Sequence, residues 1–182
     1  MIHEVKGNLI TMAQQGNFDV IGHGVNCFCI MGAGIAPQMA KAFGCDKFPL
    51  EQMLSTNECG DIIPTNNMGN INKLGQIDYK RFYIPEVITD THYASTKKYV
   101  DVVNCYTQFG FGKNHTGGAD APLDYNALRL CLKKINYTFS GQHIGLPWIG
   151  CGLGGGSKEK VRDIINDQLK DCTVTIVEYD KS

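Results

Sequence analysis

The chain has 182 residues and a mass of 20.0 kDa, and 43% of its residues are hydrophobic, which is enough for one domain with a sizeable core. Its 17 basic and 18 acidic side chains leave a net charge of −1, so it lacks the cationic excess of proteins that track a phosphate backbone, and bulk nucleic-acid binding is not expected. Glycine is the anomaly, with 21 residues where about 13 would be usual.

The sequence offers no pattern for secretion or membrane insertion. Residues 1–6 lack the charged-then-apolar order of a signal peptide, and no apolar run reaches the length of a spanning helix, so we expect a cytoplasmic protein that does not contact membranes. The eight cysteines are then expected to be reduced and mostly buried, because cytosolic disulfides are rare. The absence of a Cys-x-x-Cys pair predicts no metal, and no cofactor is expected.

Strand-like and helix-like patterns alternate along the chain. Apolar or β-branched runs predict strands over residues 19–23, 60–64, 81–84, 99–106, 143–149 and 174–179. Helical spacing of apolar residues predicts helices over 35–43, 123–135 and 157–169. The polar stretches between them, 65–76 and 109–121, are interpreted as loops bordering a site. The alternation predicts a single α/β domain over residues 1–182, with its ligand at the carboxyl ends of the strands.

The first glycine loop lies between the strand at 19–23 and the helix at 35–43. Gly32 and Gly34 remove Cβ atoms where a diphosphate could approach, and the helix that begins near Ile35 offers free N–H groups. A tight strand-to-helix turn is the alternative interpretation. Pro37 stands where a dinucleotide fingerprint has its third glycine, so a nicotinamide-dependent redox enzyme is the least favoured class.

The second glycine loop lies between the strand that ends at Ile149 and a helix with Ser157 as its predicted N-cap. It contains five glycines between residues 150 and 156. Two such loops can hold one diphosphate from opposite sides. Neither loop ends in Gly-Lys-Ser/Thr, so ATP hydrolysis is not expected. The two loops together predict a nucleotide diphosphate bound without metal.

Three segments in order, Lys6-Gly7-Asn8-Leu9-Ile10, Met31-Gly32-Ala33-Gly34-Ile35-Ala36 and Pro147-Trp148-Ile149-Gly150-Cys151-Gly152-Leu153-Gly154-Gly155, resemble the ligand segments of the macro domain family of ADP-ribose-binding proteins. The resemblance covers nearly the whole chain. It implies a three-layer α/β/α macro domain with a central mixed, mostly parallel sheet. It also implies a monomer whose small-molecule ligand is ADP-ribose or ADP-ribose 1″-phosphate.

Two branches of that family are similar to this chain. The ADP-ribose 1″-phosphate phosphatase branch is similar in Asn8, in the pair His23 and Asn26, and in the segment Thr107-Gln108-Phe109-Gly110-Phe111-Gly112. This resemblance implies hydrolysis to ADP-ribose and phosphate. The terminal ADP-ribose glycohydrolase branch is also similar, but this chain has Gln108 and Gly154 where that branch has a lysine and an aspartate. Its lysine-adduct route therefore does not carry over. A non-catalytic ADP-ribose reader, and a hydrolase that removes ADP-ribose from modified macromolecules by another mechanism, remain as alternatives.

The resemblance gives most of the candidate site residues their roles. Asn8 is expected to meet the adenine, Asn26 the distal ribose, and Tyr179 or Phe109 to stack on the ligand or cover it, although core packing is the alternative for each aromatic ring. The expected substrate-binding residues are Gly7, Asn8, Leu9, Ile10, Val25, Asn26, Met31, Gly32, Ala33, Gly34, Ile35, Ala36, Phe109, Ile149, Gly150, Cys151, Gly152, Leu153, Gly154, Gly155 and Tyr179.

His23 and Asn26 are the expected catalytic residues. Histidine titrates near neutral pH, so His23, at the predicted carboxyl end of a buried strand, is the candidate proton carrier or nucleophile. A histidine that merely satisfies its hydrogen bonds at a strand end is the alternative. His115, Asp120 and Asp124, beyond the strand at 99–106, assist the reaction or are simply solvated.

Overall fold

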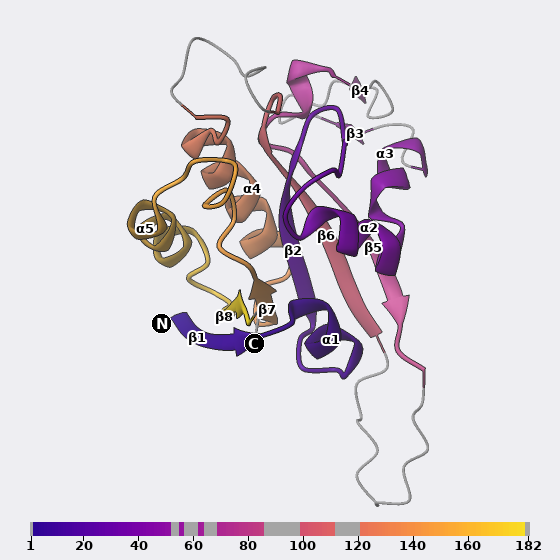
Figure 1. Cartoon of the computed structure of the whole chain (residues 1–182), viewed down its shortest axis with the longest axis vertical. Coiled ribbons are helices and arrows are strands. Elements are labelled where there is room, and N and C mark those ends of the chain that lie inside the picture. Colours follow the sequence, from indigo (N-terminus) through magenta and orange to yellow (C-terminus); the bar gives the residue numbers. More distant parts are fainter. Residues whose placement is uncertain are drawn as a thin grey trace, which may run out of the picture.

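A six-stranded sheet with the order β1-β8-β7-β2-β6-β5 forms the centre of the computed structural model, which describes residues 2–51, 55–56, 62–63, 69–85, 99–111 and 121–180 (Figure 1). Its strands are β1 (Ile2–Gly7), β2 (Val20–Asn26), β5 (Ile77–Tyr83), β6 (Tyr99–Gln108), β7 (His143–Leu146) and β8 (Thr173–Tyr179). The short strands β3 (Ser55–Thr56) and β4 (Ile62–Ile63) pair with each other in a separate two-stranded sheet.

The register of the sheet sets where the strand ends meet. β1, β8, β7, β2 and β6 run parallel to their neighbours, and β5 runs antiparallel to β6. The first and last strands lie side by side, with Ile2 opposite Val174 and Gly7 opposite Tyr179. The carboxyl ends of β1 and β8 therefore form one continuous edge, and the predicted mixed, mostly parallel sheet is confirmed.

Helices cover both faces of the sheet. α1 (Leu9–Gln14), α2 (Ala36–Phe43) and α3 (Phe48–Glu51) lie on one side, and α4 (Tyr125–Thr138) and α5 (Lys158–Gln168) on the other (Figure 1). The 3₁₀ turns η1 (Cys45–Lys47) and η2 (Ile71–Lys73) are short connections. One buried cluster joins α1 and α2 to Ile21, Val102 and Val177, and a second joins α4 and α5 to Val103 and Ile144. The predicted three-layer α/β/α architecture is confirmed.

Side chains cap three of these helices. Oδ1 of Asn8 accepts from Thr11 N at 3.1 Å at the start of α1, and Oδ1 of Asp124 accepts from Ala127 N at 3.0 Å at the start of α4. Ser157 caps α5 as predicted. Asp124, a candidate for assisting catalysis, is thus an N-cap, while His115 and Asp120 lie outside the described residues.

Some element boundaries differ from the predictions. β1 and α1 were not predicted at all, because four of the six residues of β1 are exposed and α1 is only six residues long. β5 begins at Ile77 rather than at residue 81, and β7 ends at Leu146 because Pro147 has no N–H for the ladder. The seven cysteines that the structure describes are free, five of them buried, and Cys59 lies outside the described residues.

No helix within the described residues is long and apolar enough to cross a membrane.

Two leucines of α4 test the inward face of that helix. Leu132 is fully buried, whereas Leu130 is 43% exposed, although both are apolar residues of the predicted helix over 123–135. Replacing Leu132 with alanine should lower the free energy of unfolding by about 2–5 kcal/mol, because the change leaves a cavity. The matched change Leu130→Ala should cost less than about 1 kcal/mol. Urea denaturation of both variants measures the difference, and equal costs would contradict this packing of α4.

Candidate functional site

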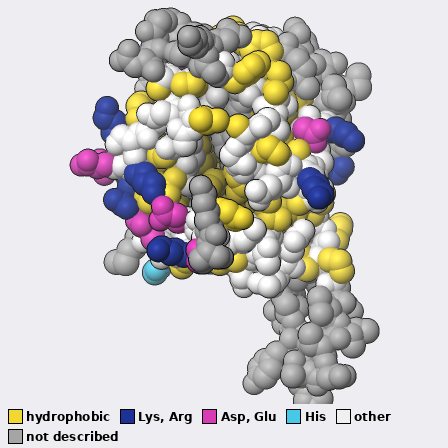
Figure 2. Space-filling view, viewed as in Figure 1, with side chains coloured by type: hydrophobic (Ala, Val, Ile, Leu, Met, Phe, Trp, Pro, Cys, Tyr) yellow, Lys and Arg dark blue, Asp and Glu magenta, His cyan; other side chains and the backbone are white. Residues whose placement is uncertain are grey.

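A cavity of about 420 Å³ opens where the carboxyl ends of β1 and β8 meet the segment that follows β7. Figure 2 shows this face of the molecule hollowed near its centre. We call this cavity the cleft; its lining consists of Gly7, Asn8, Leu9, Gly34, Ile35, Gln38, Pro147, Trp148, Cys151, Gly152, Lys158, Val177, Glu178 and Tyr179. All three of the sequence segments singled out above, together with the end of the last strand, therefore meet in one place.

Eight of the predicted binding residues line the cleft: Gly7, Asn8, Leu9, Gly34, Ile35, Cys151, Gly152 and Tyr179. Sequence reasoning missed six lining residues as site residues: Gln38, Pro147, Trp148, Lys158, Val177 and Glu178. Pro147 and Trp148 stand in the third ligand segment but were not among the predicted binding residues. Gln38 lies in the first turn of α2, directly after the first glycine loop, and this place at a helix start is the signal that could have found it. Lys158 and Glu178 resemble ordinary solvated charges in the sequence, and only the strand register brings them to the cleft.

Other predicted binding residues lie outside this lining. Ile10, Val25 and Ile149 are buried, with at most 9% of their surface exposed, and so act as core. Phe109 packs edge-on against Phe28, with 5.4 Å between ring centroids. The remaining residues outside the lining are Asn26, Met31, Gly32, Ala33, Ala36, Gly150, Leu153, Gly154 and Gly155, whose contact with a ligand stays a prediction.

The second glycine loop folds tightly back on itself. Gly156 N donates to Gly150 O at 2.8 Å, and a Cβ at Gly154 would lie 2.6 Å from that same carbonyl oxygen. A Cβ at Gly150 would meet the Leu123 side chain at 2.6 Å. Gly152 differs, because a Cβ there would meet nothing within 4 Å. Most glycines of this loop are thus required by its own fold, while Gly152 faces open space in the cleft.

The first glycine loop is held by Asn26. Oδ1 of Asn26 accepts from Phe28 N at 3.1 Å and from Ile30 N at 3.2 Å, and its Nδ2 donates to Ile30 O at 2.8 Å. The loop then reaches Gly34, whose φ of 63° is a left-handed conformation that suits glycine. The Asn26 side chain, predicted to bind ribose, is therefore occupied in shaping the loop that leads to the cleft.

His23 lies outside the lining of the cleft. The prediction that His23 ends its strand is wrong, because β2 continues to Asn26 and places His23 in the middle of the sheet. The ring is fully buried, and its Nε2 is 2.7 Å from Oδ1 of Asn104, whose Nδ2 in turn donates to Cys45 O at 2.9 Å. Burial lowers the pKa of His23 to about 4, and the Asn104 hydrogen bond opposes that shift only in part. The structure thus does not bring this histidine to the cleft.

The charged groups of the cleft lie on its α5 side. Among the described lining residues, only Lys158 and Glu178 carry a formal charge, and the Lys158 ammonium donates to Oε1 of Glu178 at 2.7 Å. This hydrogen bond, followed by the charges of Lys158 and Lys6, lowers the pKa of Glu178. Trp148 lies beside this pair, with Lys158 Nζ 5.5 Å from its ring centroid. The cleft therefore has one wall with a cation, a carboxylate and an indole.

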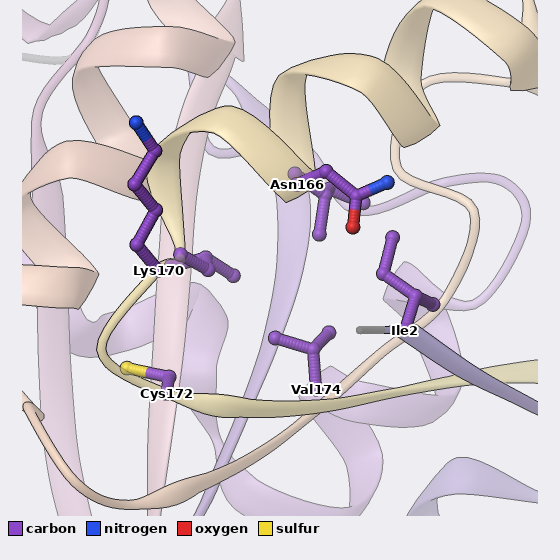
Figure 3. A pocket seen from close by; sticks show the side chains of 7 residues that line it. Ile2, Asn166, Lys170, Cys172 and Val174 are labelled. Atoms are coloured by element: carbon purple, nitrogen blue, oxygen red, sulfur yellow. The ribbon is translucent and has the colours of Figure 1, made fainter.

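A smaller hollow of about 190 Å³ lies at the opposite edge of the sheet (Figure 3). Ile2 and Val174, at the start of β1 and β8, extend toward Asn166 of α5, while the Lys170 ammonium is 3.7 Å from Asp167. Parallel sheets bind their ligands at the carboxyl ends of strands, so this hollow at the amino ends is not the site we favour.

No protein-family model matches the chain. An uncharacterised 17.5 kDa protein in the tk-vs intergenic region of Enterobacteria phage T4 is 26% identical over 184 residues, which cover 99% of this chain and 97% of the phage protein.

Solved structures share the fold more widely. The macrodomain of Thermus aquaticus DarG matches 99% of this chain and 98% of its own, with a TM-score of 0.60 and 19% identity. Thermosipho africanus DarTG in complex with ADP-ribose matches 98% of this chain and 41% of its own, with a TM-score of 0.61 and 15% identity. The chain therefore has the macrodomain fold.

The burial of His23 predicts a pH dependence of stability. The pKa of His23 is near 6.5 in the unfolded chain and about 4 in the folded one, so the unfolded state binds one more proton between these pH values. This group should lower the free energy of unfolding by up to about 1.4 kcal/mol for each unit that pH falls within that window. His23→Gln should remove the dependence.

The measurement is chemical denaturation from pH 7 to pH 4 for wild type and His23→Gln. Asp78, whose pKa burial raises to about 6, acts in the opposite direction in both proteins, so their difference isolates His23. Parallel pH profiles would contradict the burial of His23.

Proposed function

We propose that the chain is a macro domain and that its cleft binds ADP-ribose. The observation that carries this proposal is the convergence, at one edge of a macrodomain-type sheet, of an uncapped helix start, an open glycine turn and a polar adenine subsite. The helix start and the glycine turn suit the diphosphate of ADP-ribose, and the polar subsite suits its adenosine.

The start of α2 suits the diphosphate. α2 begins after Ile35, an apolar residue that makes no side-chain cap hydrogen bond, whereas Asn8, Asp124 and Ser157 cap α1, α4 and α5. The first N–H groups of a helix need acceptors, and the positive end of the helix dipole favours an anion. Gly34 and Gly152, which line the cleft without side chains, let a diphosphate approach the backbone from both sides.

The ends of β1 and β8 suit the adenosine. Oδ1 of Asn8 is engaged with Thr11 N, so the Asn8 amide nitrogen is the group that can donate to an adenine ring nitrogen. Tyr179 lies beside it in the lining and is 56% exposed, which leaves its ring accessible for stacking. The ADP-ribose complex of Thermosipho africanus DarTG, which shares this fold, supports the same choice of ligand.

Hydrolysis of ADP-ribose 1″-phosphate is the second candidate function. The sequence features that favour it are Asn8 and the pair His23 and Asn26, which resemble the phosphatase branch. The positions of the last two residues argue for a structural role, since His23 is buried on the central strand β2 and the Asn26 side chain is hydrogen-bonded to its own loop. Any phosphatase reaction here would therefore use another group to move the proton. Binding without turnover, or removal of ADP-ribose from macromolecules, is the alternative outcome.

A charge placed at Gly152 tests the proposed ligand position. A side chain there enters open space, so Gly152→Glu and Gly152→Gln should both fold, but only the glutamate adds a negative charge beside the diphosphate. Calorimetric titration with ADP-ribose should show affinity at least about 100-fold lower for Gly152→Glu than for Gly152→Gln, because like charges repel strongly at an interface. Equal affinities would place the diphosphate elsewhere.

The second candidate is tested by phosphate release from ADP-ribose 1″-phosphate, using metal-free protein and the same two variants. The phosphatase hypothesis predicts release by wild type, a large loss in Gly152→Glu and a smaller loss in Gly152→Gln, since the substrate must first bind. Tight ADP-ribose binding without phosphate release would contradict the phosphatase and leave the reader or the macromolecular hydrolase.

A further inference from the structure

The ion pair between Lys158 and Glu178, at the edge of the cleft, is exposed enough for its two side chains to separate. Lys158 and Glu178 are about half exposed, at 51% and 49%, and face the same cleft. Ion pairs this exposed contribute little to stability, so an anionic ligand group can replace the carboxylate at small cost. Lys158 is also the only cation among the described lining residues, which makes it the side-chain charge available to a negatively charged ligand.

Glu178 lies near a second cation, Lys6. It lies opposite Lys6 in the register of β1 and β8, and the charge of Lys6 contributes to lowering its pKa. If Lys158 turns to a ligand, the Glu178 carboxylate keeps a positive neighbour on the adjacent strand. The exchange therefore leaves no unbalanced charge at the wall of the cleft.

The surroundings of Lys158 fix which part of a ligand it meets. Its ammonium lies near the Trp148 ring, and the Arg162 guanidinium lies 5.0 Å from the same ring centroid. Its partner Glu178 directly precedes Tyr179 on β8, and β8 pairs with the end of β1 beside Asn8. Lys158 thus belongs to the end of the cleft where the adenosine is proposed to lie.

We propose that this wall recognises a phosphate monoester on the ribose of the adenosine moiety, which replaces Glu178 as the partner of Lys158. The inference rests on the proposed ADP-ribose binding and adds a substrate class to it. A phosphate monoester carries a charge of about −1.5 to −2 and three acceptor oxygens, so it is a stronger partner for an ammonium than a single carboxylate. The 2′ and 3′ esters present the same chemistry to Lys158, and the experiment distinguishes between them.

The experiment uses three probes: ADP-ribose, and ADP-ribose with a phosphate on the 2′ or on the 3′ oxygen of its adenosine ribose. Binding is followed by calorimetry and by the fluorescence of Trp148, which is the only tryptophan of the chain and lines the cleft. The variants are Lys158→Met, Glu178→Gln and Lys160→Met. Lys160 is the matched control, because it lies on the same helix but over the Tyr125 ring, outside the lining.

Wild type should bind one of the phosphorylated probes about tenfold more tightly than ADP-ribose, as expected of one hydrogen-bonded charge contact. The ratio should fall to about one in Lys158→Met, persist in Lys160→Met and rise in Glu178→Gln. The probe that gives the larger ratio identifies the ester position. ADP-ribose binding without any preference, or equal losses in Lys158→Met and Lys160→Met, would overturn this inference alone. No binding of any probe would overturn the proposed function as well.

Discussion

The parallel pairing of the first strand with the last is the constraint on which the site depends. β1 and β8 are separated by most of the chain, yet their register places Gly7 opposite Tyr179. This pairing sets Asn8, at the start of α1, beside the end of β8, and β7 on the other side of β8 adds Trp148. Because parallel strands end at one edge, polar groups distant in sequence gather there and a cleft forms between the helix layers.

The glycines that first attract attention serve two different purposes. Gly150, Gly154 and Gly156 let one loop close on itself, where any Cβ would collide with a backbone carbonyl or with Leu123. Gly34 and Gly152 instead leave the cleft open at the start of α2 and in the turn after β7. Gly150, Gly154 and Gly156 fix the shape of the loop after β7, and this shape holds Gly152 in place at the cleft. Such preorganisation lowers the entropic cost of binding a ligand there.

The alternating apolar patterns predicted an α/β domain and the glycine clusters predicted the two loops, because both signals are local properties of the sequence. The three layers and the mixed sheet were implied by the resemblance to the macro domain family. The predictions from sequence failed where the position of a residue in the tertiary structure decides its role. The apolar run stops at His23, which predicts a strand end there. β2 instead continues through Gly24 and Val25, so the His23 ring is buried within the sheet beside Asn104. Lys158 and Glu178 resemble solvated charges in the sequence, and only the strand register and the start of α5 show that they face the cleft.

We propose that one nucleotide lies along the edge formed by β1, β8 and the start of α2, and a crystal structure of the protein grown with ADP-ribose would locate it. We expect adenine against Asn8 and Tyr179, with the diphosphate at the first N–H groups of α2 and beside Gly152. Density for the nucleotide in the hollow between α5 and the amino ends of β1 and β8, or an empty cleft at saturating ADP-ribose, would contradict it.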